Sequence, residues 1–292
     1  MNTSLVVQTI INGLLLGGVY SLVGIGITLI FGVMKIVNFA AGAYLVWGMY
    51  FTYIWHGITG LQAYALIPLV ILSMIVFGYV TFRLTIRQVL GTGFTTFILI
   101  TMGLSFFLQN LAELIFGTMP LRVPSSISMS AARIGGFVFV YPRVIAFVAM
   151  VVIVLGLGIL LNKTILGRAM RATAENAEVA EMLGINTEKT FTIAFLIGVT
   201  MAGVAGLLVT PMFFVSPAVA ETFRLTPLVA VVLGGLGNVR GALLGGFIVG
   251  VVETLANTFI SADIGIGVVC ILFLIVVYLF PQGLFGKGAR AA

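Results

Sequence analysis

The residues able to carry out chemistry are few in this chain and widely separated. The 292 residues include one histidine, His56, one cysteine, Cys270, and eight Asp and Glu in all. A metal centre needs several such ligands held close together, and nucleophilic catalysis needs a base beside the nucleophile. Neither arrangement is apparent, and a single cysteine excludes an intramolecular disulfide. The sequence therefore predicts no catalytic site, no metal site and no bound cofactor.

A nucleotide-binding loop is also absent from the sequence. The nearest match, Gly286-Lys287-Gly288, lacks both the preceding glycine spacing and the Ser or Thr of a P-loop. If the protein uses ATP, we expect ATP and Mg to be bound by partner subunits.

Two carboxylates, Glu113 and Glu253, fall within apolar segments. Ionisable residues inside a membrane commonly mark ion pathways. Glu113 is close to the outer end of its segment, whereas Glu253 lies deeper and is the better functional candidate. Two isolated carboxylates make a poor proton relay, so the sequence favours a passive or externally driven conduit. A self-sufficient ion-coupled carrier or channel is the alternative.

The composition indicates an all-α polytopic transmembrane bundle. Hydrophobic residues make up 61% of the chain and charged residues 8%, against about 25% charged residues in a soluble domain. Transmembrane barrels need strict alternation of residue type, which runs such as 144–161 do not show. The 14 cations are dispersed over the connections and form no face for nucleic acid.

Nine apolar segments predict eight to ten crossings, within a single transmembrane domain that covers residues 1–292. The first segment is long enough to be tilted or broken near Gly17–Gly18, and the seventh is too short to span, which suggests a re-entrant or half helix. The segments are 5–33, 36–55, 63–84, 94–116, 142–161, 190–212, 225–237, 241–260 and 264–281.

The cations between these segments predict the orientation, because cytoplasmic loops of membrane proteins are enriched in Lys and Arg. We expect the N-terminus outside and the C-terminus in the cytoplasm. Ten cations then fall inside and four outside. The inner set is Lys35, Arg83, Arg87, Lys163, Arg168, Arg171, Lys189, Arg240, Lys287 and Arg290, and the outer set is Arg122, Arg133, Arg143 and Arg224.

The extracytoplasmic loop, residues 117–142, contains Pro120, Pro124 and several serines. This composition predicts irregular surface chain. Small residues also recur every four positions elsewhere, as in Gly13-x3-Gly17-x3-Ser21 and Gly246-x3-Gly250. Because such residues let helix backbones approach closely, they predict tight helix packing; lining a narrow solute path is the alternative.

The polar segment 162–190 holds eight charged side chains inside an otherwise apolar chain. Its residues 175–184, ENAEVAEMLG, predict a short helix with acidic residues near the N-terminus and Gly184 as the C-cap. Arg171 and Glu175 have the i,i+4 spacing of an ion pair on a helix that starts earlier. Met182, Leu183 and Ile185 form an apolar tip. The segment is suited to docking in a groove of a soluble partner; an ordinary solvated loop is the alternative.

Four stretches of this sequence resemble branched-chain amino acid ABC transporter permeases of the LivH type. Residues 167–208 resemble the cytoplasmic loop and following helix of that family. Residues 13–50 resemble its opening segment, including the VNFA-x-G pattern at Val37–Gly42. Residues 233–253 and 279–287 resemble its C-terminal third.

The resemblance implies a permease subunit of a bacterial ABC importer. Its partners would be a second permease of LivM type, two cytoplasmic ATPase subunits, an extracytoplasmic solute-binding protein and membrane lipid. The segment that matches 167–185 would be the coupling helix that receives the motion of the ATPases. The residues that carry this implied role are Gly167, Arg168, Arg171, Glu175, Asn176, Glu178, Glu181 and Gly184.

Candidate residues for the translocation path are Tyr20, Asn38, Phe39, Gly42, Gln109, Asn110 and Glu253. Hydrogen bonding between helices is the alternative role for the polar ones. Ala41 stands where the family commonly has a polar side chain. The solute therefore stays open between branched-chain amino acids, urea, short amides and other small organic molecules.

Overall fold

The computed structural model describes residues 3–124, 131–134, 137–261 and 264–285. Lys287, Arg290 and the sequence Gly286-Lys287-Gly288 lie outside this part of the chain. The helices are α1 (Thr3–Met34), α2 (Ala41–Thr59), η1 (Ala63–Leu66), α3 (Ile67–Leu84), η2 (Ile86–Val89), α4 (Phe94–Phe116), α5 (Tyr141–Lys163), α6 (Ile165–Glu175), α7 (Ala177–Met182), α8 (Thr187–Val209), α9 (Val219–Gly234), α10 (Val239–Phe259) and α11 (Gly265–Leu279), and the strands are β1 (Ala131–Ile134) and β2 (Phe137–Val140).

Each of the nine predicted segments is a helix in the structure, which confirms the helical fold class. Among the described residues, six helices are long and apolar enough to cross a membrane: α1, η1–α3 with η2, α4, α5, α8 and α10. The prediction of eight to ten crossings exceeds these six. The shorter or more polar helices α2, α9 and α11 account for the difference; α9 has 16 residues, fewer than the roughly 20 that a crossing needs.

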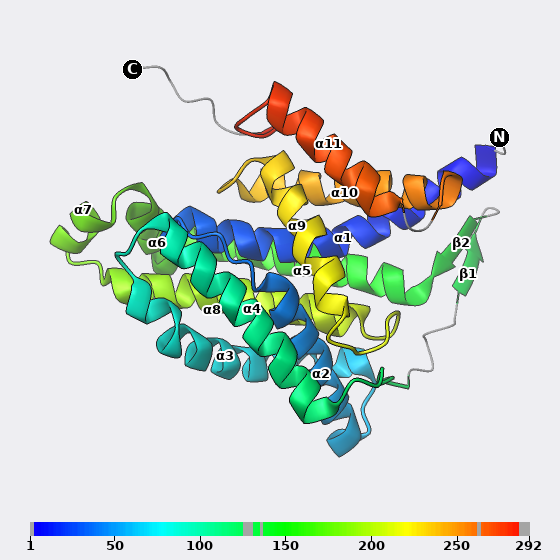
Figure 1. Cartoon of the computed structure of the whole chain (residues 1–292), viewed down its shortest axis with the longest axis horizontal. Coiled ribbons are helices and arrows are strands. Elements are labelled where there is room, and N and C mark those ends of the chain that lie inside the picture. The colour runs from blue at the N-terminus through cyan, green and yellow to red at the C-terminus, as the bar shows by residue number, and fades with distance from the viewer. Residues whose placement is uncertain (1–2, 125–130, 135–136, 262–263, 286–292) are drawn as a thin grey trace.

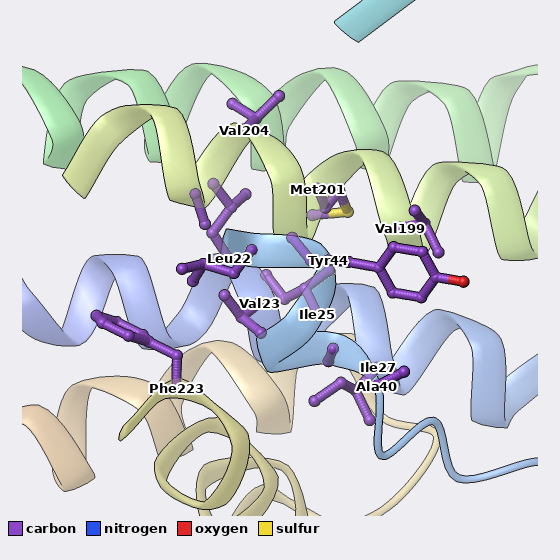
Figure 2. Close-up of a cluster of buried hydrophobic side chains, with 14 of the residues drawn as sticks. Leu22, Val23, Ile25, Ile27, Ala40, Tyr44, Val199, Met201, Val204 and Phe223 are labelled. Atoms are coloured by element: carbon purple, nitrogen blue, oxygen red, sulfur yellow. The ribbon is translucent and has the colours of Figure 1, made fainter. Parts of the chain in front are cut away.

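The core lies where α1, α2, α8 and α9 meet. Figure 2 shows apolar side chains from these four helices gathered around Tyr44, with Leu22 and Ile25 of α1 beside Met201 of α8. Phe223 of α9 closes one side and stacks at a tilt on Tyr20, with ring centroids 5.6 Å apart. Helices α1 and α8 are mostly buried, whereas α4 and α5 are mostly exposed.

Glycines form a close seam between α1 and α10. A Cβ placed at Gly250 would stand 2.5 Å from the Cα of Gly17, and one at Gly17 would stand 2.9 Å from the Cα of Phe247. Such contacts are closer than a side chain allows, so the two backbones touch directly. The ladder that starts at Gly13 therefore serves helix packing.

Helix α1 is continuous through Gly17–Gly18, so of the two forms predicted for the first segment, tilted or broken, the break does not occur. Gly17 is covered by α10, and Gly18 is covered by Phe147 and Met150 of α5.

The extracytoplasmic loop contains regular structure that the sequence did not indicate. Strands β1 and β2 pair antiparallel, with Ala131 opposite Val140. The Gln8 amide of α1 donates to the carbonyl of Val138 and accepts from its N–H, each at 2.7 Å. The prediction of irregular chain is therefore wrong at these strands, since a side-chain amide can complete an exposed strand edge.

Candidate coupling surface and solute path

Helices α6 and α7 lie at one end of the molecule, far from the N-terminus and the β-hairpin (Figure 1). The Thr164 hydroxyl caps α6 by accepting from the N–H of Gly167 at 3.1 Å. Gly167 packs against the Leu161 carbonyl so closely that a Cβ would clash with it. The end of α5 and the start of α6 are therefore in backbone contact.

Arg171 lies on the exposed side of α6, and its guanidinium donates to the carbonyl of Leu161. It makes no ion pair with Glu175, so the predicted i,i+4 pair is wrong. The open carbonyls at the end of α5 compete for the cation, because a helix C-terminus carries partial negative charge.

The six residues of α7 are closed by a cap at each end. The side chain of Asn176 accepts from the N–H of Val179 at 3.1 Å. At the other end, Gly184 takes φ +83°; its N–H donates to the Glu181 carbonyl at 2.9 Å, and that of Ile185 donates to Ala180 at 3.0 Å. This pair of bonds is a Schellman motif, which confirms Gly184 as the predicted C-cap.

The outer face of α6–α7 combines charge with an apolar tip. Met182 is 85% exposed and Leu183 76% exposed, so both apolar side chains are available for contact with another protein. The charged predicted coupling residues are all exposed around them; these are Arg168, Arg171, Glu175, Glu178 and Glu181. The inner face of the pair buries Met170 and Ala180, so this surface is presented on a packed support.

An ion pair that the sequence did not indicate ties the same end of the molecule together. The Arg87 guanidinium of η2 lies 2.7 Å from the Glu188 carboxylate at the start of α8. Both side chains are partly exposed, so the pair contributes little stability, about 1 kcal/mol or less. Arg87 and Glu188 are about a hundred residues apart in the chain, so no local pattern in the sequence predicts their contact.

The predicted path residues of the N-terminal third lie where the chain passes from α1 to α2. Lys35 follows the last residue of α1 and has φ +58°, and residues 35–38 form no helix or strand. The side chain of Asn38, 3% exposed, accepts from the N–H of Ala40 at 3.0 Å. Phe39 is half-buried. The Thr101 hydroxyl of α4 contacts the Val37 carbonyl at 3.3 Å, which joins this break to α4.

Gly42 brings α2 onto α9. A Cβ at this position would stand 3.0 Å from the N of Arg224 and would clash with the carbonyl of Ala220. The Arg224 guanidinium lies 2.5 Å from the Glu221 carboxylate and 5.7 Å from the ring centroid of Phe106, midway along α4. This cluster of α2, α4 and α9 holds an ion pair among apolar helices.

Arg224 is therefore part of a helix and was predicted as part of a connection. Helix α9 starts at Val219, six residues before the predicted segment, because Glu221 and Arg224 pair at i,i+3 and so offset each other's charge. That spacing is visible in the sequence and was the available signal.

The predicted path residues on α4, Gln109 and Asn110, lie on the more exposed side of that helix. Asn110 is exposed and Gln109 is half-buried, and their amides donate within the helix to the Phe106 carbonyl at 2.8 Å and to the Ser105 hydroxyl at 3.1 Å. Glu113, one turn further, is also exposed. The surface of α4 thus exposes Asn110 and Glu113 beside apolar side chains.

Tyr20 and Glu253 form a separate site inside the α1–α10 contact. The Tyr20 hydroxyl faces the Glu253 carboxylate. Glu253 is 5% exposed, and one of its oxygens has no hydrogen-bond partner. The structure therefore brings Gly42 against α9, whereas Glu253 lies on α10 beside Tyr20 of α1.

The fold is that of a multi-pass helical membrane protein with an exposed, charged helix pair at one end. A family model described as branched-chain amino acid transport system / permease component matches residues 9–279, and the chain belongs to this family. It is the permease subunit of an ABC importer, and family membership favours this function over a self-sufficient carrier.

Two curated relatives match almost end to end. The high-affinity branched-chain amino acid transport system permease protein BraD of Pseudomonas aeruginosa is 32% identical, over 96% of this chain and 95% of its own length. The permease protein LivH of Escherichia coli K12, named for the same high-affinity system, is 30% identical over the same shares. A solved structure of PsaBC from Streptococcus pneumoniae in complex with Fab has a similar fold, with a TM-score of 0.52 and 12% identity over 93% of this chain and 91% of that one.

Proposed function

We propose that this subunit moves branched-chain amino acids, or a closely related small organic solute, inward across the bacterial inner membrane. An extracytoplasmic binding protein would deliver the solute, and a second permease of LivM type would complete the path. Two cytoplasmic ATPase subunits would bind ATP and Mg and supply the drive. The two near full-length relatives, both named as permease proteins of branched-chain amino acid transport systems, support this assignment.

The observation that carries the proposal is the exposed surface of α6–α7. It is a structured polar helix pair with bare apolar side chains at its tip, which is the form of an element that docks in a groove of another protein. The ATPases would bind there. In the proposed orientation α6–α7 would lie in the cytoplasm, and the β-hairpin and the N-terminus would lie outside.

Two substitutions on this surface test the assignment. Gly184→Pro is incompatible with φ +83° because proline fixes φ near −65°, and it also removes the N–H that donates to Glu181. Arg168→Glu reverses an exposed charge. Both variants should insert and assemble with the second permease but lose solute-stimulated ATP hydrolysis.

The matched control is Arg83→Glu, a reversal of an exposed arginine at the end of α3. It should retain stimulation. Normal stimulation in both Gly184→Pro and Arg168→Glu, measured on the assembled complex, would contradict the coupling role.

The proposed solute path runs along the cluster of α2, α4 and α9. Asn38, Gly42 and Arg224 would line it from this chain, and the exposed Asn110 and Glu113 of α4 would face the second permease. Polar side chains at this depth are costly in lipid, so a protein or aqueous neighbour is the expected surrounding of α4.

A further inference from the structure

A cavity of about 720 Å³ opens between α1, α5, α6 and the start of α10. A second cavity of about 730 Å³ adjoins it and shares the lining residues Asn162, Arg171 and Asn238. Both lie at the end of the molecule that carries α6. None of the path residues lines either cavity, so the function proposed above does not account for them.

Two arginines, Arg171 of α6 and Arg240 of α10, line the first cavity. Within the described chain neither one pairs with a carboxylate. Arg240 is the second residue of α10, where the positive end of the helix adds to its charge. The cavity is therefore lined by two cations without a carboxylate partner, of which Arg171 donates to the Leu161 carbonyl.

The same cavity becomes apolar toward the centre of the bundle. Along α5 its lining passes from Asn162 through Leu161 to Val154, a distance of about 12 Å at 1.5 Å per residue. On α10 the lining likewise passes from Arg240 to the apolar Leu243. Thr28 of α1, which is fully buried and whose hydroxyl has no hydrogen-bond partner, also lines the apolar part of the cavity. A ligand that fits both parts has an anionic head and an apolar body.

The helices beside the cavity have the surface of helices that face lipid. The exposed side chains of α5 between Val148 and Ile159 are all apolar, and α11 exposes Leu274 and Leu279. This contrasts with α4, which exposes Asn110 and Glu113. A bilayer lipid can therefore reach the cavity from the α5 side.

We infer that this cavity binds one anionic glycerophospholipid. Its phosphate lies between Arg171 and Arg240, and an acyl chain lies along Val154 and Leu243. Basic pockets between membrane helices bind anionic lipid head groups in this manner. The bound lipid joins α6 to α10, so it stabilises the support of the docking surface.

Paired substitutions in the fully assembled importer test the inference. Arg240→Gln removes one rim cation; its control, Arg83→Gln, removes an exposed arginine outside the cavity. Gly158→Leu fills the apolar part, and the control Gly156→Leu makes the same change on an exposed position of the same helix; a Cβ at either glycine meets nothing within 4 Å.

The complexes are equilibrated with vesicles of phosphatidylcholine containing phosphatidylglycerol, and retained lipid is measured by native mass spectrometry. Arg240→Gln should retain about fivefold less phosphatidylglycerol, since a cation beside an anionic head group contributes about 1 kcal/mol. Gly158→Leu should reduce retention at least as much, and both controls should match the wild type. Equal retention in all five proteins would overturn the inference.

A second arm separates a lipid from a free anion. Inorganic phosphate in excess should not displace the bound phosphatidylglycerol, because it cannot occupy the apolar part of the cavity. If inorganic phosphate displaces the lipid fully, or if Gly158→Leu retains lipid while Arg240→Gln does not, the site is one for a free anion and the lipid assignment is refuted.

Discussion

Replacing Asn176 with alanine should weaken the coupling of ATP hydrolysis to transport about fivefold while leaving the membrane helices intact. The Asn176 side chain caps α7 through the N–H of Val179 at 3.1 Å, and loss of an N-cap costs about 1 kcal/mol. A six-residue helix has almost no stability of its own. A loss of about 1 kcal/mol shifts the equilibrium between folded and opened α7 about fivefold, since tenfold corresponds to 1.4 kcal/mol.

The assay is solute-stimulated ATP hydrolysis by the complete importer in proteoliposomes, with hydrogen exchange of residues 177–183 measured in parallel. Asn186→Ala is the matched control, because Asn186 caps α8 in the same way, through the N–H of Lys189 at 2.9 Å. Helix α8 has 23 residues and is held by packing, so the same lost cap should leave stimulation nearly unchanged. Asn176→Ser keeps a capping oxygen and should behave as the wild type.

Three results would refute this reasoning. If Asn186→Ala lowers stimulation as much as Asn176→Ala, the effect is general. If Asn176→Ser loses as much stimulation of ATP hydrolysis as Asn176→Ala, the amide acts by direct contact with a partner and its capping role is irrelevant. Faster exchange in residues 177–183 with unchanged stimulation would show that α7 does not need to be folded for coupling.

Further substitutions test the packing seam, the path and the source of drive. Gly250→Ala places a Cβ 2.5 Å from a backbone atom of α1 and should lower the free energy of unfolding by about 1–3 kcal/mol, which is measured as a lower melting temperature. Gly103→Ala is the control: its Cβ meets nothing within 4 Å, so its melting temperature should stay that of the wild type. Arg224→Gln removes the cation of the α9 ion pair and should lower the uptake rate more than tenfold with normal assembly. Uptake at the wild-type rate would show that Arg224 is not part of the path. Glu221→Gln should lower the uptake rate less, because Glu221 is more exposed than Arg224. Glu253→Gln should keep ATP-dependent uptake that survives collapse of the proton and sodium gradients; uptake abolished by that collapse in the wild type would instead indicate an ion-coupled carrier.

The helical segments could be predicted from the sequence because their signals are local. Each apolar run is long compared with the uncertainty of its ends, and lipid solvation requires every backbone group in it to be paired within the helix. The short helix α7 was predictable for the same reason, since Gly184 at its end is a local signal for a left-handed residue.

The contacts that define the candidate path could not be predicted, because they depend on tertiary packing. The approach of Gly42 to Arg224 joins positions 182 residues apart in the chain, and glycine on a helix does not specify which backbone it will meet. The start of α9 was misplaced because a charged residue in an apolar chain was assigned to a connection. Arg224 was in fact compensated by Glu221 on the same helix.

The glycine contacts also indicate how a displacement at α6–α7 would travel. Gly167 holds α6 against the end of α5, and α7 leads directly into α8 through Asn186. On α8, Gly198 lies against the backbone of Gly26 in α1, and Gly203 against that of Gly48 in α2. Backbone contacts of this kind have no flexible side chains to absorb motion. A partner that moves α7 would therefore move α8, α1 and α2 together. Backbone contacts of the same kind join α1 to α10 at Gly17 and Gly250, and α2 to α9 at Gly42, so these helices would follow as parts of the same body.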